Sequence, residues 1–274
     1  MTWNWRAMRA MMRKDLKQVT QNKMVWLPMV IVPAIFLIVF PALVVVLPTL
    51  APPSEFKADD LAPLFRQMPE QFKKPLEGLT LQQQFTILGA NFLFAPMFLL
   101  IPLMVSSILG ADSFAGEKER KTLEGLLYTP ISDMELFVAK LLTALAPAMV
   151  INVVSFVLYG LVVNLGGYHA IGHIFFPTVT WWPLVFWMGP AVSVAGLGAT
   201  VLMSSKAKTF MEAQQISGTL VLPIVFLMIG QITGLFFLSI ALMFAIGVVI
   251  WGVGIWLIWI GAKTFSRGEL IARI

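Results

Sequence analysis

The chain has 274 residues, of which 58% are hydrophobic and only 12% charged, about half the charged share of a soluble globular domain. Water therefore cannot be the solvent for most of the chain, and the composition indicates an integral membrane protein. There is no cysteine, which excludes disulfide frameworks, thiolate nucleophiles and cysteine-ligated metals. His169 and His173 lie in a glycine-containing stretch without a nearby carboxylate, so we expect no metal site. The net charge of +5 indicates membrane topology rather than a nucleic-acid partner.

Stretches without Asp, Glu, Lys or Arg predict the membrane crossings. A helix needs about 20 apolar residues to cross a hydrocarbon core of roughly 30 Å. The charge-free stretches are 24–54 and 78–111, with room for one crossing each, and 141–205 and 213–262, with room for two each. We therefore expect an all-α fold with six transmembrane helices near 25–50, 85–110, 139–165, 181–204, 215–231 and 235–262. The fifth is so short that a re-entrant hairpin is an alternative.

Lysine and arginine set the expected orientation. The segments that share a side with the N-terminus carry 15 of the 19 basic residues, and they are 1–24, 110–140, 205–215 and 262–274. By the positive-inside rule this side is the cytoplasm, so both termini are expected inside the cell. The outer end of the fourth helix then holds Trp181, Trp182 and Trp187, which suits rings that prefer the membrane interface.

Two segments outside the spans have a distinct character. Residues 1–24 predict an interfacial helix with an apolar and a basic side. Its apolar side holds Trp5, Met8, Met12, Leu16 and Val19, and its basic side holds Arg6, Arg9, Arg13, Lys14 and Lys17. Residues 51–83 are too charged and proline-rich for a tight turn, so we expect an extracellular loop with short helices. Without an internal repeat or second domain, 1–274 is expected to be a single transmembrane domain.

The sequence offers no energy source of its own. A nucleotide-binding loop needs G-x-x-x-x-G-K-[ST], because its glycines let backbone N–H groups cradle phosphates. The nearest string, GEKERKT at 116–122, lacks the second glycine. Proton or sodium coupling usually places acidic or histidine side chains at membrane depth, and the interiors of the predicted spans hold none. We expect a chain without catalytic residues or a bound cofactor, which relies on another polypeptide for uphill work.

Residues 112–137, between the second and third predicted spans, contain the densest cluster of charge. Apolar side chains recur there at helical spacing, and Thr129-Pro130 ends that pattern. Ser132, followed by Glu135 three residues later, is a capping box that predicts the start of the next helix. The segment is therefore expected to form a short amphipathic helix, a sharp turn and the beginning of the third span.

This segment also carries a motif. It consists of Glu117, Glu119, Arg120, Thr122, Leu123, Glu124, Leu126, Leu127, Pro130, Leu136 and Lys140. In its residues and their spacing the chain resembles the ABC-2 type permease subunits of ATP-binding-cassette transporters. A weaker likeness runs from Glu212-Ala213-Gln214-Gln215 through Gly218 to Pro223, and the six-helix layout fits as well.

The resemblance implies that 112–137 is a cytoplasmic coupling segment that packs on an ATPase. The residues it assigns to coupling are Glu117, Glu119, Arg120, Thr122, Leu123, Glu124, Leu127, Pro130 and Glu212. It also implies two copies of a separate ATPase that binds ATP and Mg, and a second permease copy or a related permease. Export of a lipid, drug-like or peptide substrate from a cell membrane, such as the bacterial inner membrane, follows from the same resemblance.

Polar side chains inside the spans allow two interpretations. Buried amides and hydroxyls commonly join helices by hydrogen bonds, which we favour, whereas the alternative is that Asn91, Asn152, Ser155 and Gln231 line a pathway. Two other functions also stay open. One is a membrane scaffold or immunity protein that transports nothing, and the other is a channel or secondary carrier, against which the missing intramembrane charges count.

Overall fold

The computed structural model describes residues 3–50, 52, 65–66, 68–120, 122, 131–233, 235 and 237–264. These residues are helical or irregular, with no strand among them. Six helical stretches are long and apolar enough to cross a membrane, which confirms the predicted six-helix fold. We number them as spans: Lys23–Pro48, Leu81–Glu119, Asp133–Ile171, Trp181–Lys206, Phe210–Ile232 and Ile240–Lys263.

Several spans combine α-helix with single turns of π-helix or 3₁₀-helix. The first consists of α2 (Lys23–Ala34), η1 (Ile35–Val39) and α3 (Phe40–Leu50). The second consists of α6 (Leu81–Leu88), η4 (Gly89–Leu93), α7 (Ala95–Phe98), α8 (Leu100–Ala111), η5 (Asp112–Gly116) and α9 (Glu117–Glu119). The third is α11 (Asp133–Ile171), and the fourth is α12 (Trp181–Pro183), η6 (Leu184–Met188) and α13 (Gly189–Lys206). The fifth is α14 (Phe210–Ser217), η7 (Gly218–Leu220) and α15 (Val221–Ile232), and the sixth is α16 (Ile240–Thr264).

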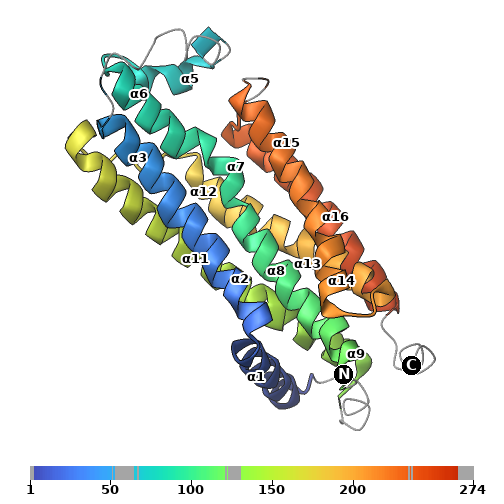
Figure 1. Ribbon diagram of the computed structural model, residues 1–274. Coiled ribbons are helices and arrows are strands. Elements are labelled where there is room, and N and C mark those ends of the chain that lie inside the picture. The colour runs from blue at the N-terminus through green and yellow to red at the C-terminus, as the bar shows by residue number, and fades with distance from the viewer. Residues whose placement is uncertain are drawn as a thin grey trace.

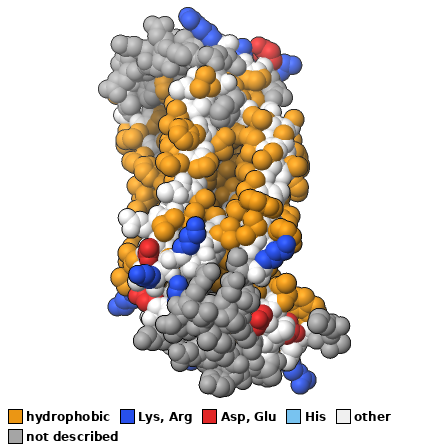
Figure 2. Space-filling view, turned by 90° about the vertical axis from the view of Figure 1, so that its right-hand side faces the viewer, with side chains coloured by type: hydrophobic (Ala, Val, Ile, Leu, Met, Phe, Trp, Pro, Cys, Tyr) orange, Lys and Arg blue, Asp and Glu red, His pale blue; other side chains and the backbone are white. Residues whose placement is uncertain are grey.

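The second and fourth spans form the centre of the bundle, and the others surround them (Figure 1). In the most apolar windows of the central spans 78% of the residues are buried, against 22% in the first and fifth and 17% in the sixth. Outward-facing side chains on the peripheral helices are largely hydrophobic. Figure 2 shows charged side chains gathered toward the two ends, with hydrophobic side chains covering the face between them. Such a band is what a bilayer requires of a spanning surface.

Helix α1 (Trp5–Gln21) lies at the end of the bundle where α9 and the start of α11 meet (Figure 1). Its buried residues are Met8, Met11, Asp15 and Val19. The predicted apolar face was therefore only partly right, because Met11 and Asp15 are buried whereas Trp5 is 57% exposed. The physical reason is that one face of α1 packs on other helices of the protein. The residues at positions 8, 11, 15 and 19 share this face of the helix and are therefore buried.

The end of the third helix also differs from the expectation. The third span was predicted to end near residue 165, before Gly166 and Gly167, but α11 continues through both glycines to Ile171. A Cβ atom on Gly167 would lie 2.6 Å from the Phe175 ring, so this glycine allows a close packing contact instead of a turn. The helix ends at Gly172, whose φ of 80° is in the left-handed region that glycine adopts most readily.

The fifth and sixth spans are shifted relative to the prediction. The fifth begins at Phe210 and reaches Ile232, which gives 23 residues and is long enough for a full crossing. The sixth begins at Ile240 instead of residue 235. Ser239 explains this start, because its side-chain oxygen accepts a hydrogen bond from the Leu242 N–H at 3.3 Å, as an N-cap residue does.

The two predicted loops are described in part. Within 51–83, α5 (Glu70–Lys73) and η3 (Lys74–Leu76) are the short helices that we expected, and much of 51–67 lies outside the described residues. At the other end of the bundle the capping box is confirmed, because Ser132 and Glu135 exchange both hydrogen bonds. The coupling residues Leu123, Glu124, Leu127 and Pro130 lie outside the described residues.

The bundle leads to a test of topology. Lys73 and Lys208 are separated by the second, third and fourth spans, so an odd number of crossings should place them on opposite sides. Single cysteines at these positions in this cysteine-free chain should react with impermeant maleimide from opposite sides, with Lys73→Cys labelled in intact cells. Labelling of both from the same side would show that the six-crossing topology is wrong.

Candidate coupling site

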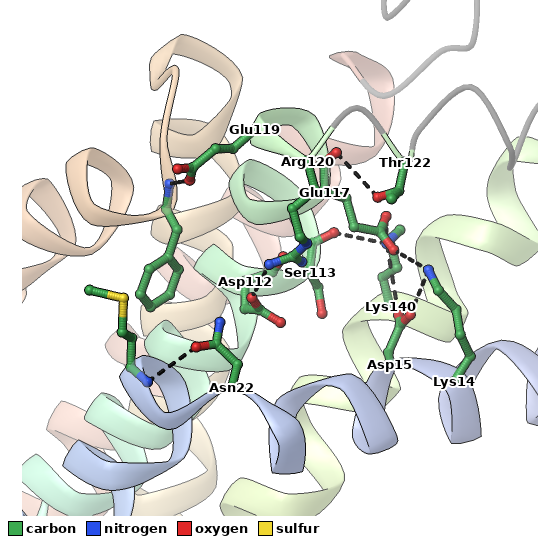
Figure 3. A network of polar contacts seen from close by, with 12 residues as sticks. Lys14, Asp15, Asn22, Asp112, Ser113, Glu117, Glu119, Arg120, Thr122 and Lys140 are labelled. Atoms are coloured by element: carbon green, nitrogen blue, oxygen red, sulfur yellow. Dashed lines mark hydrogen bonds and ion pairs between the residues drawn. The ribbon is translucent and has the colours of Figure 1, made fainter.

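Four charged side chains meet where the second span, the third span and α1 come together (Figure 3). We call Lys14, Asp15, Glu117 and Lys140 the charge clasp. The Lys140 ammonium donates to Glu117 Oε2 and, at 2.8 Å, to the Ser113 carbonyl. The Lys14 ammonium lies 2.6 Å from Glu117 Oε1 and 3.3 Å from Asp15. Glu117 therefore connects a lysine of α1 to a lysine of α11.

The clasp is buried, and this determines its energetics. Lys140 is 0%, Glu117 1% and Asp15 4% exposed. An isolated charge in such a place costs many kcal/mol in lost hydration, so it is tolerated only when it is paired and hydrogen-bonded. Two ammonium and two carboxylate groups balance each other here, and the Ser113 carbonyl accepts a further N–H of Lys140. The three helices are consequently held by charges that none of them could bury alone.

Asp15 is the least satisfied member of the clasp. Asp15 Oδ2 lies 3.8 Å from Lys140 Nζ. Neither carboxylate oxygen of Asp15 accepts a hydrogen bond from the described residues. Burial raises the pKa of Asp15, and the nearby Lys140 offsets only part of this rise. For Lys14, burial alone would lower the pKa, but the contacts with Glu117 and Asp15 together outweigh burial and the pKa is raised.

A second ion pair lies beside the clasp. Arg120 Nη1 is 2.9 Å from Asp112 Oδ1, and Nη2 donates to the Asp112 backbone carbonyl at 3.3 Å. Asp112 is buried and belongs to the π-helical turn η5. Gln18 of α1 lies next to the same guanidinium, and with its amide oxygen turned toward it Gln18 accepts from Arg120 Nε at 3.3 Å. Arg120 therefore folds back onto its own helix and onto α1.

The neighbouring residues of α9 contact the start of the fifth span. Glu119 Oε2 accepts a hydrogen bond from the Phe210 N–H at 2.8 Å, where α14 begins with unpaired N–H groups. Lys118 donates to the Ala207 carbonyl at 3.1 Å. Glu212 accepts from the Lys208 N–H at 2.8 Å and stabilises the same turn. Hydrogen bonds of Glu119 and Lys118 therefore connect the turn at 207–212 to the end of the second span.

Of the predicted coupling residues, the structure brings together those that it describes. Glu117, Glu119, Arg120 and Thr122 follow one another at the end of the second span, where the Thr122 N–H donates to the Glu117 carbonyl at 3.1 Å. Glu212 lies on the turn that Glu119 and Lys118 hold. Sequence reasoning missed the role of Asp15. An acid within the row Met8, Met11 and Val19 was the available signal, because a charge on an apolar helix face needs a partner.

The proposed pathway residues are buried among the helices. Asn152 donates to the Val185 carbonyl at 2.9 Å and Gln231 to the Phe92 carbonyl at 2.9 Å, whereas Asn91 donates to Ile87 of its own helix at 3.2 Å. Ser155 is buried as well. The two amide contacts between spans agree with the helix-joining interpretation.

The π-helical turn η4 receives donors from three spans. Its consecutive carbonyls at Ala90, Asn91 and Phe92 accept from Tyr159 at 2.5 Å, Trp181 at 3.2 Å and Gln231 at 2.9 Å. Trp181 is the first residue of the fourth span, as predicted, but its ring is fully buried among other helices and is not exposed on the surface of the bundle. A buried indole N–H needs an acceptor, and the Asn91 carbonyl supplies it.

A comparison with known families gives the class of the chain. The family model described as ABC-2 family transporter protein matches residues 9–255, and the chain belongs to this family. It is therefore a multi-pass membrane protein and the membrane component of an ABC transporter. Permeases of this family work with a cytoplasmic ATPase, which implies such a partner here. Comparisons with curated proteins and with solved structures found no significant match.

Removing Lys140 tests the clasp. Lys140→Met leaves Glu117 with the half-exposed Lys14 as its only close cation among the described residues, and breaking a buried ion pair costs about 3–5 kcal/mol. We expect a clear drop in the thermal unfolding midpoint of the purified chain, partly recovered when Glu117→Gln is added. Lys73→Met is the control, since it removes only the surface pair with Glu70 and should cost about 0.5 kcal/mol or less. Equal effects of Lys140→Met and Lys73→Met would contradict the clasp.

Asp15 leads to a pH-dependent prediction. Because its folded-state pKa is raised, its contribution to stability is present below the unfolded pKa and is lost as pH rises through the folded pKa. Asp15→Asn removes this loss. The variant should therefore match or exceed the wild type in unfolding midpoint at about pH 8, with a smaller difference at about pH 4 where aspartic acid begins to protonate. A wild type that gains stability over Asp15→Asn as pH rises would show that the sign is wrong.

Proposed function

We propose that this chain is the permease half of an ATP-driven exporter. Two copies, or one copy and a related permease, form the membrane core, and two ATPase subunits bind at the end that holds the charge clasp. That end is the cytoplasmic one in this proposal, because it carries most of the basic residues. ATP and Mg bind to the partner, and the substrate is a lipid, drug-like molecule or peptide that moves outward.

The connections of the segment that leaves the second span carry this proposal. Residues 112–120 contact α1 and α11 through the charge clasp and the turn at 207–212 through Glu119 and Lys118. A push on this segment therefore acts on the second, third and fifth spans together. Coupling of this kind needs a continuous physical connection between two sites, and charged contacts in a buried place provide it.

Long helices support the same proposal. The second and third spans have 39 residues each, about 58 Å at 1.5 Å per residue, which exceeds the roughly 30 Å hydrocarbon core. Their charged ends can therefore project from the membrane and reach a water-soluble partner. The string GEKERKT does not form a phosphate-binding loop over its described start, since Gly116 is in a π-helical turn and Glu117–Glu119 is α-helical.

Leu127 provides the test of ATPase docking. An apolar anchor at the centre of an interface typically accounts for about 2 kcal/mol or more, so Leu127→Asp should weaken retention of the co-expressed ATPase by about 30-fold or more. Co-purification and ATP turnover in lipid nanodiscs measure the effect. Arg120→Glu is a poorer probe, because it would also break the pair with Asp112.

The control for this test is Arg66→Glu, in the loop at the opposite end of the bundle, which should retain the ATPase fully. Size-exclusion profiles identify variants that fail to fold. Full ATPase retention by a folded Leu127→Asp variant would remove the coupling role of this segment. A wild-type chain that retains the ATPase but shows neither transport nor stimulated ATP turnover would instead favour the scaffold function.

A further inference from the structure

A cavity of about 810 Å³ is lined in part by residues of α5, η3, α6 and η4. Helices α5 and α6 lie at the end of the bundle opposite the charge clasp (Figure 1). Four elements surround it: the short helices at 70–76, the second span near η4, the loop at 177–180 and the start of α16. Its size falls within the range of about 300–1,000 Å³ that is typical of small-molecule sites. The lining residues that matter for its chemistry are Phe72, Phe92, Thr178, Thr180, Ser239 and Ala241.

Two aromatic side chains, Phe72 and Phe92, form part of the largely apolar wall of this cavity. The rings of Phe72 and Phe92 meet edge to face with centroids 5.0 Å apart, and Phe72 stacks on Phe237 at 6.0 Å. The side-chain amide of Gln231 donates a hydrogen bond to the Phe92 backbone carbonyl at 2.9 Å. This part of the apolar surface is therefore held by ring packing and by a hydrogen bond from the fifth span.

Hydroxyl groups supply the polar part of the lining. Thr178 and Thr180 place their side-chain oxygens 2.9 Å apart. The Ser239 oxygen accepts from the Leu242 N–H, which leaves its hydroxyl hydrogen available to a ligand. None of the described residues that line the cavity carries an ionisable side chain. A charged group that enters this half-open cavity would lose part of its hydration without gaining a counter-charge from the described lining, which is unfavourable.

We propose that this cavity binds an uncharged, single-chain amphiphile whose alkyl chain packs on the phenylalanines and whose hydroxyl head contacts the Thr178, Thr180 and Ser239 side. Because the described lining has no ionisable group, we expect the cavity to bind this ligand more tightly than fatty acids, cationic drugs or peptides with charged termini. Binding does not depend on the ATPase. Only the further step, that the ligand is a substrate on its way out, rests on the proposed function.

Photolabelling of the purified full chain in nanodiscs tests the binding. The probe is a monoacylglycerol with a diazirine in its acyl chain, and fatty-acid and quaternary-ammonium probes with the same chain are compared with it. We expect the neutral probe to label peptides that contain residues 72–92, 177–180 or 239–241, with about tenfold less labelling by either charged probe because of their desolvation cost. Excess unlabelled monoacylglycerol should abolish the labelling.

Two alanines of α16 provide matched variants. Ala241 lines the cavity, and Ala245 is an exposed residue one turn further along the same helix that does not. Ala241→Phe should fill the space and lower labelling by about tenfold, and Ala245→Phe should leave it unchanged. Equal labelling by the charged probes, or labelling that survives competition in the wild type, overturns the proposal whether or not Ala241→Phe folds.

Turnover of the complex with the ATPase separates this proposal from the proposed function. Stimulation of ATP hydrolysis by monoacylglycerol in the wild type, lost in Ala241→Phe and kept in Ala245→Phe, supports both the site and its role in export. Specific labelling without any stimulation supports the site and counts against export of this ligand. Stimulation without specific labelling supports an exporter and overturns the site.

Discussion

Lys140 has no exposed side-chain surface, and an ammonium group buried so completely needs its counter-charge within the protein. Glu117 on the preceding helix supplies this counter-charge, and Asp15 of α1 lies nearby. Lys14 contacts both carboxylates and supplies the second positive charge. The relative positions of three helices follow from this requirement. Such a cluster contributes specificity of arrangement more than net stability, because desolvation offsets most of the attraction. Under the proposed function, contacts that join three helices at one end of the bundle would help to transmit a movement of the ATPase to the spans.

Inside the bundle, backbone carbonyls of irregular turns also need hydrogen-bond partners within the protein. A π-helical turn changes the hydrogen-bond register of a helix, and such turns are frequent at functional sites. Here three of them accept donors from neighbouring spans: η4 from Tyr159, Trp181 and Gln231, η5 from Lys140, and η6 from Asn152. Buried polar groups without water have to be paired, so irregular backbone in one span is tied to side chains in another.

Sequence reasoning could predict features that depend on nearby residues. Six crossings follow from the length of apolar stretches, and the start of the third helix follows from Ser132 and Glu135. Contacts between residues far apart in the sequence were harder to predict, because no local pattern marks them. Lys14 and Glu117 are 103 residues apart, and the burial of Asp15 depends on α1 meeting the protein instead of only lipid. The predicted end of the third span, just before Gly166 and Gly167, was wrong because glycines serve both in chain reversals and in close packing, and here Gly167 packs on Phe175.

The second span connects the two ends of the molecule. Phe92 lines the cavity near α5 and Glu117 belongs to the charge clasp, and both lie in the single helical stretch Leu81–Glu119. Between them, every residue of α8 except Met104 is buried, so this part is held on all sides. The two irregular turns, η4 and η5, lie at the cavity and at the clasp. Packed helices move as rigid bodies while irregular turns absorb changes in backbone geometry. Under the proposed function, force applied at the clasp would therefore reach the cavity as a displacement of α8, with η4 as the place where the ligand-binding wall can change shape.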